Sequence, residues 1–192
     1  MKREQWFFLI CLFLICVMAA TPGTPRRQVF DAPLYGCGHH QQTDVSSVYY
    51  PTVPTKATEG RFQPEDQNVR YRDDCYAGSL STRTDNDTGV CTVVETNHGI
   101  TVSHTVAVWW AAGKRTGMSV TAVSGTVITV DGGSGDNLPA LSTAIEIGAE
   151  PTASVGNLIY AGDVEFIATD LRRVRFLQTA ASAKLNCNYK RP

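Results

Sequence analysis

The chain has 192 residues, a formal net charge of −1 and a pI near 6.4. This length has room for one domain, or for one domain that carries an extended arm. The even balance of charge gives no electrostatic reason for a nucleic-acid partner, which needs clustered positive charge. The basic pairs Lys114-Arg115 and Arg172-Arg173 are predicted to be solvated strand ends.

Residues 1–20 have the pattern of a secretory signal peptide. Lys2 and Arg3 precede an apolar run over residues 6–18, and Ala19-Ala20 supplies small residues for cleavage. The run is shorter than the ~20 apolar residues that a spanning helix needs, so a short hydrophobic anchor is the alternative. We expect a secreted or cell-surface protein with no stable membrane span after processing.

The cysteines predict two disulfides. Two of the six lie in the apolar run, which leaves Cys37, Cys75, Cys91 and Cys187. An even number in an exported chain favours disulfides, and the absence of a C-x-x-C spacing disfavours zinc. Of the three possible connectivities, we favour Cys75 with Cys91 and Cys37 with Cys187.

Residues 21–67 are predicted to be an extended, proline-rich arm. Six of the nine prolines lie here, and proline fixes φ and cannot donate to a strand ladder. Apolar residues such as Phe30, Leu34 and Phe62 are too frequent for a free linker. We expect the arm to lie across the domain or across a neighbouring subunit, with partial disorder as the alternative. The Cys37–Cys187 bridge would tie it to the last strand.

Residues 68–192 are predicted to form an all-β domain. Strands are expected over residues 69–76 and 89–94, joined by a polar segment in which Asx-type turns are favoured over a calcium site. The sequon at Asn86 is a possible glycosylation site in a host that glycosylates. The Cys75–Cys91 bridge would close this local segment.

The central stretch, residues 101–147, predicts a meander of four strands joined by glycine turns. Its loop over residues 131–136 contains a single copy of a calcium-repeat-like pattern, which is too little to predict a metal. At the C-terminus, Leu185, Cys187 and Tyr189 alternate with polar residues, which predicts a closing strand with one solvated face. The expected fold is an antiparallel β-sandwich or small barrel.

No catalytic motif is present in the sequence, and no cofactor or metal is predicted. The pairs His98/His104 and His39-His40 lack a nucleophile context, and no G-x-S-x-G, H-E-x-x-H or phosphate-binding loop occurs. The candidate binding residues on the surface are aromatic. Parity on the strand places Trp110 in the core and Trp109 on the opposite face. An exposed Trp109 could stack on a sugar, with Tyr49 or Tyr50, or fill a subunit interface; cover by a second sheet or by the arm is the alternative.

Five short motifs carry a resemblance to a known group of proteins: HGIT (98–101), VAVWW (106–110), GKRTGM (113–118), VTAVSG (120–125) and DGGSGDNLP (131–139). Over residues 98–147, about a quarter of the chain, the sequence resembles small uncharacterised β-modules of phage and prophage structural proteins and of related bacterial proteins. The resemblance implies a virion-like structural role. The signal peptide and the cysteines depart from a virion protein that assembles inside a cell.

Together these features predict an exported, non-enzymatic structural protein. It would be a subunit of an extracellular surface, filament or virion-like assembly, and its partners would be copies of itself or other surface proteins. The alternative is a carbohydrate-binding β-sandwich module that uses exposed aromatic residues. Exposure of Trp109 separates the two hypotheses.

Overall fold

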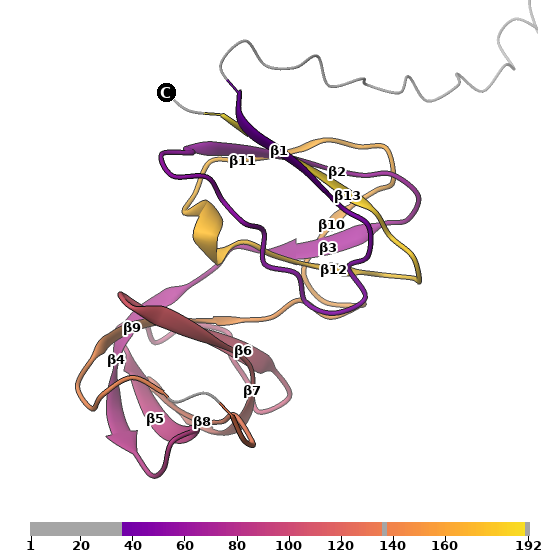
Figure 1. Cartoon of the computed structure of the whole chain (residues 1–192). Coiled ribbons are helices and arrows are strands. Elements are labelled where there is room, and N and C mark those ends of the chain that lie inside the picture. The colour runs from indigo at the N-terminus through magenta and orange to yellow at the C-terminus, as the bar shows by residue number, and fades with distance from the viewer. Residues whose placement is uncertain (1–35, 136–137, 191–192) are drawn as a thin grey trace, which may run out of the picture. The chain divides into compact units, whose positions relative to one another are not determined.

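A computed structural model of the chain describes residues 36–135 and 138–190, with side chains described from His40 onward. The described residues are almost entirely β-structure, with thirteen strands and a single 3-10 turn. The predicted all-β class is therefore confirmed. The sequence left a sandwich and a barrel open as alternatives, and the described residues form both (Figure 1).

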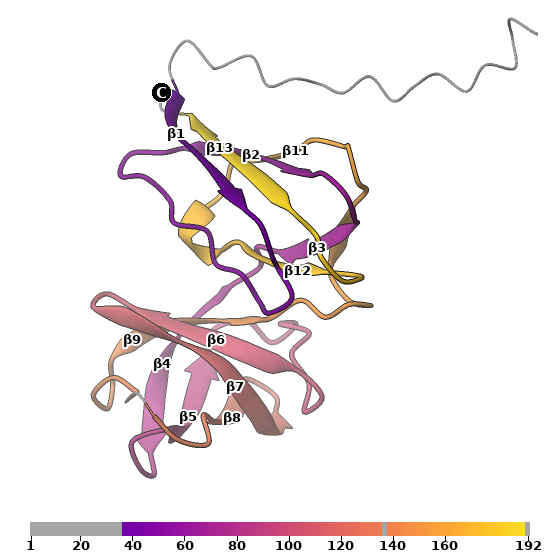
Figure 2. The ribbon, with the colours of Figure 1, turned by 45° about the vertical axis from the view of Figure 1, so that its right-hand side comes forward.

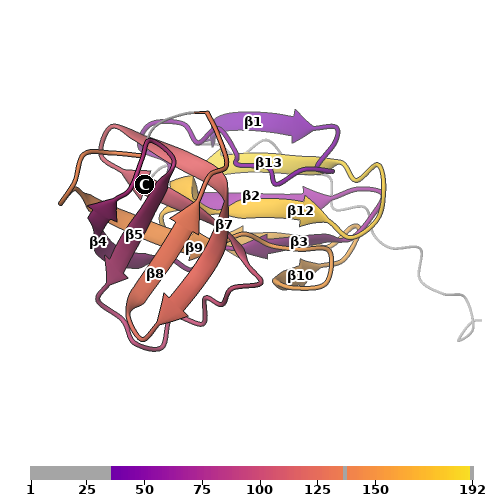
Figure 3. The ribbon, with the colours of Figure 1, turned by 90° about the horizontal axis from the view of Figure 1, so that it is seen from below.

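Six consecutive strands form a closed antiparallel barrel (Figure 3). In chain order they are β4 (Tyr76–Arg83), β5 (Thr88–Val93), β6 (Thr105–Trp110), β7 (Gly113–Ser124), β8 (Val127–Asp131) and β9 (Ala144–Ala149). Around the barrel the order is β4-β5-β8-β7-β6-β9. The four strands predicted for the central stretch are all present. The meander continues only through β6, β7 and β8, because β9 pairs with β6 and β4 instead of β8.

The barrel interior is filled by the inward-facing residues of each strand. Leu80, Val106, Val108, Met118, Ile128 and Ile147 have no exposed surface. Strands approach closely at Gly78, where a Cβ atom would lie 2.3 Å from the Thr92 carbonyl oxygen, so only glycine fits. Closure leaves this unit without edge strands, and its hydrogen-bonding groups are used internally.

The remaining strands form a two-layer sandwich. One layer has the order β1 (Gly36–Gln42), β13 (Leu185–Lys190), β2 (Glu59–Pro64) and β11 (Glu165–Ile167). The other has the order β10 (Asn157–Ile159), β3 (Val69–Arg72) and β12 (Arg175–Gln178), and the 3-10 turn η1 (Leu171–Arg173) precedes β12. Figure 2 shows the four strands of the first layer side by side. All pairings are antiparallel.

Aromatic residues join the two layers of the sandwich. Phe62 from β2 packs on Phe176 from β12, with ring centroids 4.7 Å apart, and Tyr189 meets Phe62 edge-on at 6.1 Å. Phe176 also contacts Tyr71 of β3 at 6.1 Å. Such tilted and edge-on geometries suit the aromatic quadrupole. The predicted inward positions Leu185, Cys187 and Tyr189 are confirmed as core residues.

The outer face of β13 is more enclosed than the alternation predicts. Asn186 is 9% exposed and Asn188 is 4% exposed, although we expected this face to be solvated. The side chain of Asn186 donates to Glu65 at 2.9 Å and accepts from Gln41 at 3.0 Å. Strands on both sides of β13 thus supply polar partners that a single-strand pattern cannot reveal.

The barrel is inserted into the sandwich. The chain leaves the sandwich after β3 and returns at β10, and these two strands are hydrogen-bonded neighbours with Tyr71 opposite Asn157. In Figure 1 the sandwich therefore takes its colours from both ends of the bar, indigo to magenta for β1 to β3 and orange to yellow for β10 to β13, whereas the barrel takes the colours between them. The expected boundary at residues 67/68 does not separate these units, because strands from both sides of it share one core.

Part of the predicted arm belongs to the sandwich. Residues 21–35 lie outside the described residues, and so does the predicted signal peptide. Residues 36–67 supply β1 and β2, and β2 pairs with both β13 and β11. Phe62, one of the apolar residues that made a free linker improbable, has no exposed surface. This portion is a pair of sheet strands because its apolar side chains complete the core.

The predicted disulfides are corrected by the positions of the thiols. Cys75, Cys91 and Cys187 are all free. Cys91 points into the barrel core opposite Leu80, whereas Cys75 precedes β4, five residues and roughly 16 Å along that strand. Bridging needs Cα atoms within ~7 Å, so the Cys75–Cys91 prediction is wrong. Cys187 stands opposite His40 in the sandwich core, and the side chain of Cys37 lies outside the described side chains.

Candidate functional site

The most interconnected set of polar and aromatic side chains lies where the barrel meets the sandwich. We call Tyr50, Trp109, Glu150 and Arg175, with the neighbouring Asp74, the junction. Trp109 comes from barrel strand β6 and is 3% exposed. Exposure and cover were both left open for Trp109; exposure is therefore wrong, and cover by the arm segment is confirmed by Tyr50, whose ring is 6.2 Å away.

Arg175 is the centre of the junction. Its side chain is 0% exposed, and its guanidinium donates to three backbone carbonyls: Ala149 from Nε at 3.0 Å, Asp74 from Nη2 at 2.9 Å and Arg173 from Nη1 at 2.8 Å. An Asp74 carboxylate oxygen lies 3.4 Å from Nη2. Burying an unpaired charge is very costly, and these contacts supply the compensation.

The Trp109 ring lies against two arginines. The guanidinium carbons of Arg173 and Arg175 are each 5.3 Å from its centroid, within the range of a cation–π interaction. Arg173 also forms an ion pair with Glu146 of β9. The indole of a barrel residue and two cations of the sandwich thus face one another, which fixes the contact between the two units.

Glu150 holds a second set of contacts. Its Oε1 accepts hydrogen bonds from the Tyr50 hydroxyl at 2.5 Å and from the Gly117 N–H at 2.8 Å, and the residue is 4% exposed. The Lys114 ammonium lies 4.1 Å from the centroid of the Tyr50 ring. Burial and the neighbouring carboxylate raise the pKa of Tyr50, while burial lowers the pKa of Lys114. Tyr50 therefore stays neutral and acts as a hydrogen-bond donor.

The side chains of the junction are better suited to holding the barrel and the sandwich together than to covalent catalysis. The Cys75 thiol lies 3.5 Å from Nη1 of Arg175, and a nearby cation usually favours a thiolate. Burial is the larger effect and raises the pKa of Cys75 to about 11, so the thiol is protonated at neutral pH. Most other polar groups of the junction are consumed by bonds between the barrel and the sandwich.

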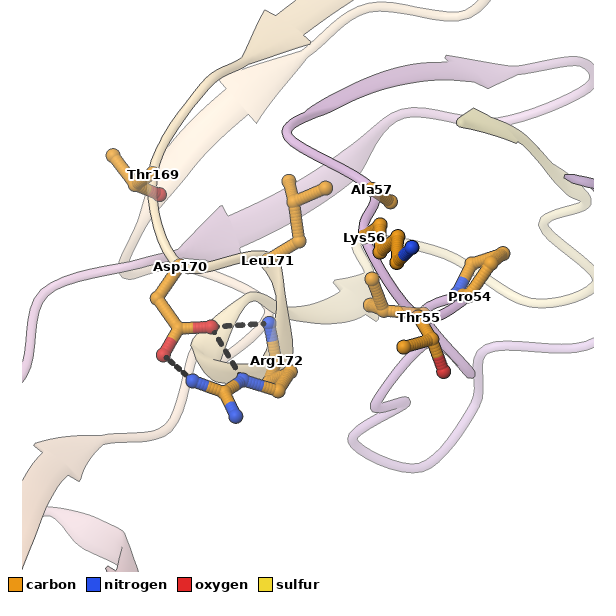
Figure 4. Close-up of a pocket in the computed structure, with 9 residues that line it drawn as sticks. Pro54, Thr55, Lys56, Ala57, Thr169, Asp170, Leu171 and Arg172 are labelled. Atoms are coloured by element: carbon orange, nitrogen blue, oxygen red, sulfur yellow. Dashed lines mark hydrogen bonds and ion pairs between the residues drawn. The ribbon is translucent and has the colours of Figure 1, made fainter. Parts of the chain in front are cut away.

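A surface pocket of about 350 Å³ lies beside η1 (Figure 4). Its wall combines a turn with the residues around η1: Val53, Pro54, Thr55, Lys56, Ala57, Thr169, Asp170, Leu171 and Arg172. Lys56 has a φ of 72°, which is uncommon for a residue with a side chain, and the turn is closed by a 3.1 Å bond from the Ala57 N–H to the Pro54 carbonyl.

The one carboxylate that lines the pocket, that of Asp170, is paired with Arg172. Asp170 accepts from the Arg172 side chain at 2.9 Å and 2.8 Å and from the Arg172 backbone N–H at 3.2 Å. The Arg172 guanidinium holds the pKa of Asp170 below its ordinary value. Figure 4 shows this pair facing each other instead of the turn. The pocket is therefore a poor candidate for acid–base catalysis, because its carboxylate is charged and bound.

The other sequence-predicted residues have structural roles or exposed positions. Asn86 is exposed in the β4–β5 loop, and its side-chain oxygen accepts from Arg83 at 2.8 Å. In the same loop Asp85 accepts from the Asp87 and Thr88 N–H groups at 3.1 Å and 2.7 Å, which confirms the predicted Asx-type turn. Tyr49 bridges to Phe176 by two backbone hydrogen bonds at the sandwich edge.

His98 is a buried structural residue. Its Nδ1 accepts from the Ile100 N–H at 3.0 Å, and Nε2 lies 2.9 Å from the Gly125 carbonyl oxygen. Both ring nitrogens are thus used by backbone groups, with the proton on Nε2. His104 makes a separate local contact, accepting from the Thr101 N–H at 3.2 Å. The structure shows no direct contact between the two histidines.

No protein family, curated protein or solved structure matches this chain. The resemblance to phage structural modules therefore stays a prediction. Among the described residues no helix is long and apolar enough to cross a membrane, and no group of three or more His, Cys, Asp or Glu side chains could hold a metal ion.

Little in the sequence points to the junction. Along residues 173–177, the alternation of apolar and polar residues predicts that Val174 and Phe176 point inward, and both are fully buried. The same alternation places Arg175 outward, where a solvated arginine is the ordinary expectation. The barrel covers that face, and its carbonyl at Ala149 receives the guanidinium. The single available signal was the pair Trp109-Trp110, which implies that both faces of β6 are apolar.

Proposed function

We propose that this protein is an exported, non-enzymatic structural subunit that assembles with copies of itself. The N-terminal pattern of residues 1–20 supports export, and the resemblance of residues 98–147 to phage structural modules supports a role in an assembly. Partners would be further copies or other surface proteins of the same structure.

The observation that carries the proposal is the contrast between the two units. The barrel closes on itself, whereas the four-stranded layer of the sandwich ends in β1 and β11, each paired on one side within the described residues. Phe166 of β11 is 56% exposed, and Tyr160, in the turn that precedes β11, is 58% exposed. An open strand edge with large apolar side chains is a site for association with another chain.

The alternative function, carbohydrate binding, depended mainly on an exposed Trp109 ring. A sugar needs two or three exposed aromatic rings on one face, and Trp109 is 3% exposed. Tyr50 is engaged by Glu150 and Trp109, and Tyr49 packs against the sandwich core. None of the three predicted residues offers a free ring on which a sugar could stack.

The test is the mass of the purified protein in solution. Size-exclusion chromatography with light scattering should give masses above the 20.9 kDa of one chain, increasing with concentration. A single species of monomer mass at every concentration would overturn the proposal. A screen for hydrolase activity that remains at background would agree with the non-enzymatic role, and a turnover abolished by a point substitution would contradict it.

A further inference from the structure

The four-stranded layer of the sandwich has two unlike edges, and their directions are fixed by the sheet. The order β1-β13-β2-β11 is antiparallel at every step. Four alternating strands leave β1 and β11 running in opposite directions. A second copy added in the same orientation would therefore bring its β1 antiparallel to β11 of the first copy, and the alternation would continue without a parallel pair.

The β11 edge presents an apolar centre. Phe166 is the middle residue of this three-residue strand, and the Arg61 guanidinium carbon lies 4.9 Å from its ring centroid. The preceding turn, with the exposed Tyr160, is held beside the end of β2 by a 2.7 Å bond from the Gly162 N–H to the Pro64 carbonyl. The two exposed aromatic residues are therefore on segments fixed to the same strand.

The two edges differ in charge. Asp163 precedes β11 and Glu165 is its first residue, whose carboxylate accepts a 2.8 Å hydrogen bond from the Tyr71 hydroxyl. The seven residues of β1, GCGHHQQ, contain no carboxylate, and two of its described side chains, His40 and Gln41, are exposed, with Gln41 donating to Asn186 of β13. An acidic, aromatic edge and a long, carboxylate-free edge are complementary, whereas two β11 edges would bring like charges together.

We propose that β11 of one copy pairs with β1 of the next copy, so that the four-stranded layer continues from chain to chain. This inference rests on the proposed self-assembly and names its interface. The contact joins two different surfaces, so it is heterologous and leaves a free β1 edge and a free β11 edge at the two ends. Growth is open-ended unless the rotation between copies closes a ring. Because β11 has three residues, each contact is small and assembly depends on concentration.

The first test compares two exposed apolar residues. Phe166→Asp places a carboxylate at the centre of the proposed contact and should weaken association about tenfold or more. Val102→Asp is the matched control, because Val102 is 62% exposed in the segment between β5 and β6 of the barrel. The control should assemble like the unmodified protein. Association that is weakened equally by both variants, or by neither, would overturn the proposed interface.

Cross-linking distinguishes the proposed contact between β11 and β1 from a two-fold contact between two β11 strands. In a Cys37→Ser, Cys75→Ser background, one preparation carries Phe166→Cys and the other carries His40→Cys or Gln41→Cys, two positions that cover both faces of β1. Mild oxidation of the mixture should give a covalent dimer with one of the β1 variants. A Phe166→Cys preparation that cross-links with itself, and not with either β1 variant, would indicate a two-fold contact and contradict the proposal. A cross-link that an excess of a peptide of residues 21–35 abolishes would assign the edge to that segment instead.

The outcomes separate this inference from the function on which it rests. A monomer at every concentration overturns both. An assembly that is insensitive to Phe166→Asp and gives no cross-link between β11 and β1 overturns the interface alone, and leaves self-assembly standing.

Discussion

Replacing Arg175 tests whether the junction holds the two units together. Arg175→Met keeps much of the length of the side chain and removes its charge and all its hydrogen-bond donors. The carbonyls of Ala149, Asp74 and Arg173 would then lose the partners that they have at 3.0, 2.9 and 2.8 Å. The Trp109 ring would lose one of its two cations.

The expected cost is large for a single substitution. Removing one member of a buried, hydrogen-bonded charge cluster costs about 3–5 kcal/mol, and a buried carbonyl without a partner costs ~1–3 kcal/mol. Water entering the site would satisfy some of these groups, so we expect about 3 kcal/mol for Arg175→Met. This is a large share of the ~5–15 kcal/mol by which native domains are stable.

Urea unfolding followed by tryptophan fluorescence measures the effect, because Trp109 reports on the junction itself. Arg172→Met is the matched control: Arg172 has a 72% exposed side chain in an ion pair with Asp170, so its loss should change the free energy of unfolding by less than ~1 kcal/mol. An Arg175→Met effect as small as that of the control would refute the structural role of the buried guanidinium.

Three further predictions follow from the same contacts. Gly148→Ala should destabilise the protein by ~1–3 kcal/mol in urea unfolding, because the added Cβ atom would lie 2.5 Å from Nη2 of Arg175; wild-type stability would contradict that packing. Cys91 and Cys187 should not react with a maleimide until urea unfolds the chain, since both thiols are buried; labelling of the native protein at either position would count against the two cores. Burial raises the pKa of both thiols from an ordinary 9.0 to about 12, so the folded state keeps protons that the unfolded state releases. Their contribution to stability is complete below pH 9 and is lost as the pH rises towards 12, and a Cys91→Val, Cys187→Val variant should lose less stability over that window.

Local patterns in the sequence predicted the barrel strands β5 to β9, whereas most of β4 (Tyr76–Arg83) was expected to be a polar connecting segment. Residues 105–131 alternate, carry β-branched side chains and contain Gly125 at the hairpin, where φ is 57°. Period-two alternation depends on neighbours two residues apart, so one segment is enough to reveal it. Ser124 pairs with Val127, so the reversal lies at Gly125-Thr126.

The same local patterns could not predict which distant segments pair with one another. Barrel closure requires β9 to pair with β4, and the sandwich requires β2 to pair with β13, more than a hundred residues away. The prolines of residues 21–67 suggested an arm, yet Pro64 ends a strand that pairs with Leu185. A single sequence carries no direct signal for such partners.

The predictions for individual site residues were incomplete or wrong for a related reason. Parity placed Trp109 on the face opposite the core and could not decide whether that face is covered, because parity describes one sheet only. Arg175 looked like a solvated residue until the barrel supplied carbonyls for its guanidinium. The predicted Cys75–Cys91 pairing relied on an even count, which says nothing of distance, and the fold places Cys75 before β4 and Cys91 opposite Leu80 in the barrel core.

The central claim, that this chain assembles with itself, is tested most directly by sedimentation velocity over a hundredfold range of protein concentration. Self-assembly through unlike edges predicts a sedimentation coefficient that increases continuously with concentration, without a stop at the dimer, and that Phe166→Asp shifts back towards the monomer. A single boundary at the value of a 20.9 kDa particle throughout the range would contradict it.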